Sequence, residues 1–327
     1  MGYITKVGSF WGTVPVTSGR IFWVANADTY TVEGRSYSAS DNNDGLSPER
    51  ALRTVDYAVG LTTANVGDVI VLLPEVHSSA ATVTLDVAGI TITGLPHNNP
   101  IPSLHGSSGP ARNKCSITNT ATAGFIFTVS ADDVEIAWLD LIPVAAGGRG
   151  IYAQAGADRL YVHDCTFSMI AAAATSTYGI ALGTLATGVV DDCIVRNCTF
   201  ISGSSAQSAA NGAGVVAITT AYGLAIENCT FTMKGTAAWA SAIEQLSAGT
   251  TNMIVRDCDF LNSSTAATEG ITTAVANGGG TIDGSVQIYR CYVSAGTDVV
   301  TASAIVDCVL AETYLASAGG GALANNN

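Results

Sequence analysis

The chain has 327 residues and a net charge of −13, and only 12% of its residues are charged. That fraction is about half of the roughly 25% found in ordinary soluble domains, and the mean hydropathy is positive at +0.35. The acidic balance excludes the basic footprint of a nucleic-acid-binding protein, and no apolar run reaches the about 18 residues of a membrane-spanning helix. So few charged residues are not enough to cover the surface of a chain of this size. We therefore expect part of that surface to be buried by copies of the chain or by other proteins.

Residues 1–40 are rich in aromatic residues and glycine and show neither a repeat nor a helical period. We interpret them as an extended arm, or as one or two strands, that serves attachment or oligomerisation. The start of the chain lacks the apolar segment of a secretory signal, so the protein is expected to stay in the cytoplasm until it is assembled. The residues expected to contact a partner are Phe10, Trp11, Phe22, Trp23 and Tyr30.

A turn-rich loop from Ser40 to Gly45 superficially resembles a calcium-binding loop. The spacing of its residues does not match an EF-hand, because alignment of Gly45 with the invariant glycine places Ala51 where the bidentate glutamate belongs. The loop is therefore interpreted as a solvated turn. Ser47 predicts a helix N-cap, with Pro48 at the first helical position.

The segment from residue 48 to about 61 has apolar residues at helical spacing. It is expected to form a capping helix over the first coil of a solenoid, where unpaired strand groups and apolar core would otherwise be exposed. Strands are predicted directly afterwards, at 69–73, 83–85 and 90–92. The apolar stripe of the helix consists of Ala51, Leu52, Val55, Ala58 and Val59.

A short phrase built around a cysteine returns six times in the second half of the chain. Four copies read LYVHDCTF, CIVRNCTF, LAIENCTF and MIVRDCDF, and the weaker copies are VQIYRCYV and SAIVDCVL. Its cysteines are about 33, 31, 29 and 33 residues apart, a period that indicates stacked coils. The expected core ladder consists of Cys165, Cys198, Cys229, Cys258 and Cys291 together with Phe167, Phe200, Phe231 and Phe260.

The residue before each cysteine marks a corner between two strands, because Asn and Asp tolerate left-handed backbone there. The predicted fold class is all-β: a right-handed parallel β-helix over residues 41–315 with a short N-terminal capping helix near 48–61. About ten coils at about 4.8 Å each predict a rod of about 50 Å. Residues 316–327 are expected to form a flexible Gly/Asn tail. The corner residues are Asp164, Asn197, Asn228, Asp257 and Asp307.

The cysteines are expected to be buried thiols that pack as small hydrophobic groups. A disulfide framework is typical of short secreted proteins, and this chain is neither short nor preceded by a recognisable signal. Cys193 and Cys198 are the nearest pair, and their spacing is not that of a zinc site. We predict no metal site and no cofactor.

No constellation of the known β-helix lyases or hydrolases is found. The acidic pairs Asp132–Asp133 and Asp191–Asp192 fall at coil corners, where solvated turns are expected. His163 is expected on the exposed face of a repeat. We predict no catalytic residue and no enzymatic activity, although catalysis assembled across subunits from scattered carboxylates stays open. The arginines expected in a solvated, edge-protecting role are Arg159, Arg196, Arg256 and Arg290.

Residues 41–59, DNNDGLSPERALRTVDYAV, and 64–70, ANVGDVI, resemble the opening of pectin-lyase-like β-helix proteins. In that superfamily such a turn leads into a capping helix and the first strand. The wording at 86–95, DVAGITITGL, is most similar to β-helix virion proteins of tailed bacteriophages. The resemblance covers residues 41 to about 95 and is architectural beyond them. It implies a structural component of a phage particle without fixing which part.

Two functions of different classes are in competition. The first is a virion protein, a homo-oligomer such as a trimer that decorates the capsid or is associated with it. Its expected partners are other virion proteins such as the major capsid protein, with neither nucleic acid nor membrane. The alternative is a tailspike or fibre protein that binds or degrades host polysaccharide, an analogy from the fold. A secreted adhesin is a third hypothesis, which the missing signal disfavours.

Overall fold

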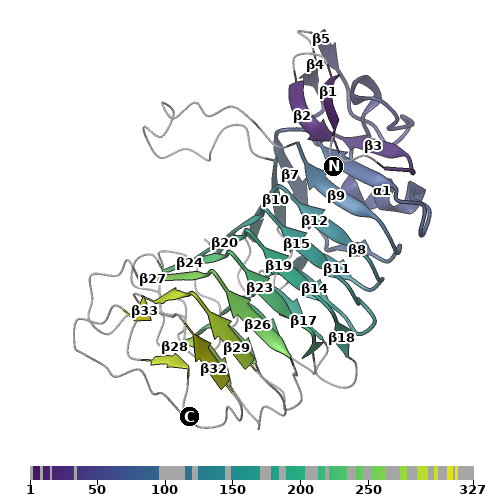
Figure 1. Cartoon of the computed structure of the whole chain (residues 1–327). Helices are drawn as coiled ribbons and strands as arrows, with labels where there is room; N and C mark the ends of the chain where they lie inside the picture. Colours follow the sequence, from purple (N-terminus) through teal and green to yellow (C-terminus); the bar gives the residue numbers. More distant parts are fainter. Residues whose placement is uncertain are drawn as a thin grey trace.

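The chain winds into a rod of stacked coils, with its first strands at one end and its last described strands at the other (Figure 1). The side chains of residues 1–16 and those beyond residue 292 lie outside the described part. This computed structural model describes residues 3–7, 10–14, 17–32, 35–95, 115–119, 124–143, 149–169, 178–183, 189–202, 213–217, 221–233, 241–245, 252–262, 273–277, 286–293, 298–300, 308–311 and 314–315.

Three long parallel sheets run along the rod, and successive coils add one strand to each (Figure 1). Sheet 1 has ten strands: β3 (Ile21–Val24), β6 (Val69–Leu72), β9 (Thr91–Gly94), β12 (Glu135–Ala137), β15 (Tyr161–His163), β19 (Ile194–Arg196), β23 (Ala225–Glu227), β26 (Met253–Arg256), β29 (Val286–Tyr289) and β32 (Cys308–Ala311). Sheet 2 has nine: β7 (Val76–Ser79), β10 (Cys115–Asn119), β13 (Leu139–Pro143), β16 (Thr166–Met169), β20 (Thr199–Ser202), β24 (Thr230–Met233), β27 (Asp259–Asn262), β30 (Tyr292–Val293) and β33 (Tyr314–Leu315).

Sheet 3 closes the third side of the coil, and the predicted right-handed parallel β-helix is confirmed. Its eight strands are β8 (Val83–Leu85), β11 (Phe125–Val129), β14 (Arg149–Ala153), β17 (Tyr178–Leu182), β21 (Ala213–Ala217), β25 (Ser241–Gln245), β28 (Thr273–Asn277) and β31 (Asp298–Val300). Three two-stranded sheets complete the described strands: antiparallel β1 (Tyr3–Val7) with β2 (Phe10–Val14), antiparallel β4 (Tyr30–Val32) with β5 (Arg35–Tyr37), and parallel β18 (Val190–Asp191) with β22 (Ala221–Tyr222).

Inward side chains stack on similar side chains of the next coil. Phe167, Phe200, Phe231 and Phe260 of sheet 2 form a ladder of rings, with centroids 4.7, 4.8 and 5.1 Å apart and planes within 7° of parallel. All four are buried, and each contributes about 1.5–3 kcal/mol through apolar burial. The core is therefore a set of parallel rows along the axis of the rod.

The rings of this ladder have room because glycines face them from sheet 3. A methyl group added to Gly179 would lie 2.7 Å from Cδ1 of Phe200 and 2.6 Å from the carbonyl oxygen of Gly214. Gly150 and Gly214 face Phe167 and Phe231 in the same way. Large residues of one sheet and glycines of another thus fill the coil together.

The predicted capping helix at 48–61 is split into two pieces. A 3-10 turn, η1, covers Pro48–Arg50, and α1 covers Val55–Leu61. The N-cap of α1 is Thr54, whose hydroxyl accepts from Tyr57 N, whereas the side chain of Ser47 makes no capping bond. Ser47 is thus the N-cap residue of η1 with Pro48 next to it, as predicted, but it caps this short turn and not α1. The helix contacts β3, β6 and β8 and so packs on the first coils.

The first coil begins earlier than the predicted boundary at residue 40, because β3 pairs with β6 in parallel. Phe22 is buried in the main core at 2% exposure. Trp23 and Tyr30 are buried in a second cluster, which the residues around β4 and β5 build over the outer face of sheet 1. The expectation that these three side chains contact a partner is therefore wrong, since the chain itself covers them.

The other two residues of the predicted interface, Phe10 and Trp11, lie in β2, and their side chains are outside the described residues. The predicted tail, 316–327, is also outside them. No helix in the described part is long and apolar enough to cross a lipid bilayer.

Candidate functional site

The outer face of sheet 1 carries most of the charged side chains that recur with the cysteine phrase. In register, His163 lies beside Arg196, Arg196 beside Glu227, and Glu227 beside Arg256 on four successive strands. We name the charged set along this face the charge ladder: Glu135, His163, Asp164, Arg196, Glu227, Arg256, Asp257 and Arg290.

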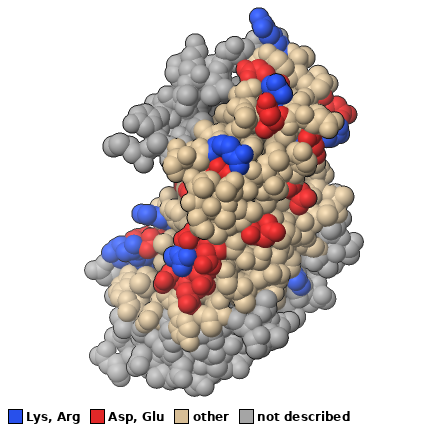
Figure 2. Space-filling view, turned by 90° about the vertical axis from the view of Figure 1, so that its right-hand side faces the viewer, with Lys and Arg blue, Asp and Glu red and all other residues tan. Residues whose placement is uncertain are grey.

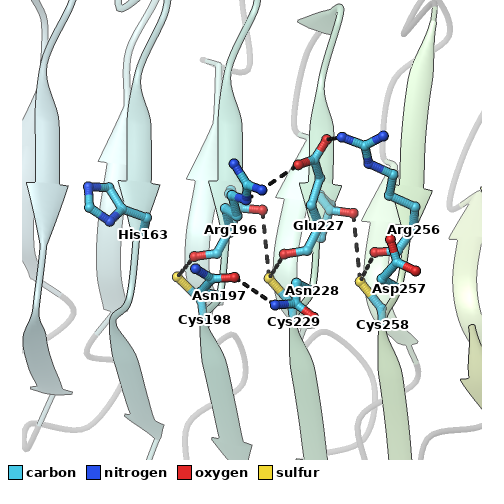
Figure 3. A network of polar contacts seen from close by, with 12 residues as sticks. His163, Arg196, Asn197, Cys198, Glu227, Asn228, Cys229, Arg256, Asp257 and Cys258 are labelled. Carbon is cyan, nitrogen blue, oxygen red and sulfur yellow. Dashed lines mark hydrogen bonds and ion pairs between the residues drawn. The ribbon is translucent and has the colours of Figure 1, made fainter. Parts of the chain in front are cut away.

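Acids and bases of the ladder bind one another from coil to coil. Figure 3 shows Glu227 between two arginines: Arg256 Nη2 lies 2.5 Å from one carboxylate oxygen and Arg196 Nε lies 3.7 Å from the other. Arg290 donates twice to Asp257, at 2.7 Å to each oxygen. The expected solvated arginines are thus exposed but paired, and each holds a carboxylate of a neighbouring coil.

His163 closes the other end of the ladder between two carboxylates. Its Nδ1 lies 2.7 Å from Asp164 Oδ2 and its Nε2 lies 2.8 Å from Glu135 Oε1. A carboxylate only accepts, so both contacts are satisfied together when the two ring nitrogens each carry a proton, as in the imidazolium. Its side chain is 14% exposed, so the expectation of an exposed face residue is wrong. Burial by itself lowers the pKa of His163, but the hydrogen bonds to Glu135 and Asp164 outweigh it and raise that pKa above its ordinary value.

Replacement of His163 by Gln is expected to remove a pH-dependent part of the stability. A raised folded-state pKa gives stability that is complete below the unfolded pKa of about 6.5 and is lost as pH rises through the folded value. The free energy of unfolding of wild type should therefore exceed that of His163→Gln by about 1 kcal/mol near pH 6. Urea titrations in steps from pH 6 upwards measure the difference, which must shrink on the alkaline side.

A second histidine provides the internal control for that experiment. His77 is buried, with Nε2 at 2.9 Å from Leu73 O, and burial lowers its pKa to about 4. Its neutral form stabilises the fold above the unfolded pKa, and this contribution is lost as pH falls towards 4. When the titration is extended down to pH 5, the acid-side slope should therefore be the same in both proteins, because Glu135, whose pKa the hydrogen bond to His163 lowers, is still ionised there. A constant difference between them across the alkaline range would contradict the role of the imidazolium.

The corner that follows sheet 1 repeats one backbone conformation. Asp164, Asn197, Asn228 and Asp257 have φ of 53°, 53°, 53° and 54°, in the left-handed region that Asn and Asp tolerate. Asn228 Nδ2 donates to Asn197 Oδ1 at 2.8 Å (Figure 3). Asn197 Nδ2 donates in turn to Asp164 Oδ1 at 3.4 Å. These side chains therefore fix the corner and bind one another. Asp307 lies outside the described residues.

Trp138 occupies the same corner one coil before Asp164 and breaks its pattern. Its φ is 56° and it is 45% exposed. An L residue without a short polar side chain pays roughly 1–2 kcal/mol for this backbone conformation. Trp138 is therefore a strained, exposed aromatic residue. It directly follows Ala137, which pairs in register with His163 on the neighbouring strand. Trp138 was not among the predicted site residues, and its place at a corner where the later coils carry Asn or Asp is the signal in the sequence that distinguishes it.

The corner before sheet 1 carries the two acidic pairs. Arg159 donates to both oxygens of Asp133, at 2.6 and 2.8 Å. Asp132 accepts from Asp158 N at 3.2 Å, and Asp158 accepts from Asp191 N at 2.9 Å. Asp132 and Asp133 are thus exposed at the corner, as expected for a solvated turn, and they also bind the backbone of the next coil and an arginine. In the second pair Asp192 is exposed, whereas Asp191 Oδ1 is buried without a hydrogen-bond partner.

The cysteines of the repeated phrase form a row just inside the corner that follows sheet 1: Cys165, Cys198, Cys229, Cys258 and Cys291. Their thiols are buried and form no disulfide. Cys198 lies 3.3 Å from Arg196 O, Cys229 3.2 Å from Glu227 O, and Cys258 3.2 Å from Arg256 O (Figure 3). These three thiols therefore donate to the carbonyl two residues earlier, whereas Cys165 lies 3.7 Å from Ile136 O on the preceding coil. Burial raises the pKa of Cys193, outside this row, to about 12, which leaves its thiol protonated. A reactive cysteine needs the opposite environment.

On the outer face of sheet 1, the acidic and basic side chains bind one another between neighbouring coils. Among the described residues, no group of three or more His, Cys, Asp and Glu side chains is arranged to hold a metal ion. Both ring nitrogens of His163 are bound to carboxylates, and in the protonated form of the ring neither has a lone pair with which to accept a proton. The ladder holds adjacent coils in register, and Trp138 is its exposed neighbour.

Comparison with known proteins identifies the fold and no more. No family model and no curated protein matches the sequence. A pectin methylesterase in complex with a hexasaccharide matches at TM-score 0.58 and 10% identity, over 94% of this chain and 92% of its own. A rhamnogalacturonan lyase matches at TM-score 0.50 and 12% identity, over 90% of this chain and 73% of its own. ORF18 of Geobacillus virus E2 matches at TM-score 0.34 and 10% identity, over 80% of this chain and 57% of its own, a level that carries no argument.

Proposed function

We propose that this chain is a structural protein of a bacteriophage virion, an oligomer that decorates the capsid or is associated with it, and that it is not an enzyme. The observation that carries the structural role is the charge ladder. Glycosidases direct a pair of carboxylates at the substrate, whereas Glu135, Glu227 and Asp257 are each held by a base of a neighbouring coil.

The resemblance to phage virion proteins supports the location of this role. It rests on residues 41–95, which form the cap and the first coils. Within them Asp41 accepts from Arg53 N at 2.9 Å and from Thr54 N at 3.0 Å, and Asn43 donates to Ala51 O at 2.8 Å. These residues build the cap, and so favour a shared architecture over a shared binding site.

The small number of charges also supports a protein that is covered by partners. Figure 2 shows a face on which the described surface is mostly uncharged, with acidic and basic side chains gathered in a few mixed groups. A protein that works alone in solution ordinarily carries more charge over its surface. Assembly with copies or with other virion proteins would cover this surface.

The test is the composition of the particle. Phage particles purified on density gradients are expected to contain the chain in a fixed ratio to the major capsid protein, and immunogold labelling should mark the head. Label on the tail would contradict the capsid location. If the chain is absent from intact particles and present only among unassembled proteins of the lysate, the virion role is wrong.

A second candidate function is recognition or degradation of host polysaccharide by a tailspike or fibre. One observation favours it: Trp138 is exposed and strained beside the ladder, and aromatic faces are common sites for apolar contact with ligands. The solved structures that share the fold include a pectin methylesterase and a rhamnogalacturonan lyase.

Incubation with host capsule and envelope polysaccharide separates the two functions. On the structural proposal, no reducing ends and no unsaturated products are released, and Trp138→Ala behaves as wild type in a glycan-binding assay. Release of either product would favour the enzyme. Retention of polysaccharide by wild type, with at least a tenfold loss in Trp138→Ala, would favour a non-catalytic fibre.

A further inference from the structure

The three sheets present very different outer faces. Sheet 1 carries the charge ladder. On sheet 3, the outward residues Tyr178 and Ala181 are already buried, at 9% and 0% exposure, in a small cluster with Phe125 and Tyr152. The outer face of sheet 2 is only partly buried, and its carboxylates Asp140 and Asp259 lie in β13 and β27, on either side of the uncharged outward residues of β16, β20 and β24. These three central strands are suited to an apolar or polar neutral partner.

Two outward rows define this face of sheet 2, which we name the threonine face. The first row runs in register through Asp140, Thr166, Thr199, Thr230, Asp259 and Tyr292. The second runs through Thr118, Ile142, Ser168, Ile201, Thr232 and Leu261.

We propose that the threonine face is the surface through which two copies of this chain associate. Thr199 and Thr230 are partly exposed on neighbouring strands. A hydroxyl both donates and accepts, so a row of threonines at the spacing of the coils is complementary to an identical row. A row of like charges would repel its copy, and the alternating charges of sheet 1 would lose solvent without a matched partner. Self-complementarity therefore points to a second copy of this chain.

The size of the face fits such a contact. Nine strands about 4.8 Å apart, each with about four residues of about 3.3 Å, outline roughly 500 Å² per chain. Two such faces bury roughly 1,000 Å², the lower limit of specific interfaces. The isoleucines and the leucine of the second row supply the apolar part of this area.

Lysine substitutions in the same two coils test the proposal. Thr199→Lys with Thr230→Lys places two charges on the threonine face. Ile194→Lys with Ala225→Lys places two charges on neighbouring strands of sheet 1, in matching register. Sedimentation equilibrium should give wild type and the sheet 1 variant a mass that is a multiple of 33.2 kDa. The threonine-face variant should dissociate, with a dissociation constant at least ~100-fold higher because unpaired ammonium groups would be buried.

Hydrogen exchange of wild type needs no substitution and covers the case in which a variant does not fold. Backbone amides of 199–202 and 230–233 should gain protection as protein concentration rises, while those of 194–196 and 225–227 should not. A wild type that stays monomeric at high concentration, or dissociation by the sheet 1 pair instead, would overturn the proposal. This association rests on the oligomer of the proposed function, but it can be refuted independently of the virion role, because self-association through this face is measured without any virion.

Discussion

Replacement of Phe200 by Ala is expected to destabilise the protein by about 3–5 kcal/mol. Phe200 is fully buried and lies between the rings of Phe167 and Phe231 at 4.7 and 4.8 Å. Its loss leaves a cavity that the neighbouring rings cannot fill, because the strands of sheet 2 are held in register on both sides. Urea unfolding followed by circular dichroism measures the change.

The control is Thr84→Ala, at the exposed central position of β8 and away from the threonine face, which should change the free energy of unfolding by less than about 0.5 kcal/mol. A loss below about 1 kcal/mol in Phe200→Ala would show that the coil collapses onto the vacancy. Solenoids are stabilised by contacts between neighbouring repeats. A broadened transition would therefore indicate that the coils on the two sides of residue 200 unfold separately.

The phenylalanine ladder was predictable because its phrase repeats, but the glycines opposite it were not. Gly150, Gly179 and Gly214 lie in sheet 3, separated from the phrases by segments of different length. A glycine among many gives no signal of its own unless its partner is known. The sequence thus predicted one side of the packing, and only the three-dimensional closure of the coil revealed the other.

The charge ladder was visible as residues but not as pairs. His163, Arg196, Glu227 and Arg256 occupy the same place in four phrases, which predicted a shared face. Which charge meets which depends on the register between coils, and coils of unequal length leave that register undetermined in the sequence. The second carboxylate on His163 is Glu135, which belongs to a coil without the cysteine phrase.

The predicted start of the β-helix at residue 41 was too late for a related reason. β3 contributes one strand to the solenoid before the capping helix, so it has no preceding copy with which a repeat could be recognised. Phe22 and Trp23 in a glycine-rich segment then suggested an exposed arm. Parallel pairing with β6 places one on the inner face and the other on the outer face, where the residues around β4 and β5 cover it.

Asp68 joins this first strand to the rest of the rod, and Asp68→Asn is expected to cost about 2–4 kcal/mol. The carboxylate is completely buried and accepts from Arg20 N at 2.6 Å, Thr63 N at 2.8 Å and Arg20 Nη2 at 3.1 Å. An amide of the same size presents one NH₂ group to these donors and leaves at least one of them unpaired. Thermal and urea unfolding measure the loss, and Asp86→Asn at an exposed position is the matched control.

The pH dependence shows whether the charge of Asp68 is responsible. Burial alone would raise the pKa of Asp68, but the hydrogen bonds from Arg20 N and Thr63 N, with the guanidinium of Arg20, hold it below its ordinary value. This stability is complete above the unfolded pKa of about 3.9 and is lost as pH falls through the folded value. The difference from Asp68→Asn should therefore be constant near neutrality and shrink in acid. If it persists undiminished at acid pH, shape and not charge accounts for the loss. Because Arg20 directly precedes β3, the variant should also become sensitive to proteases at residues 17–25 before the coils beyond them open.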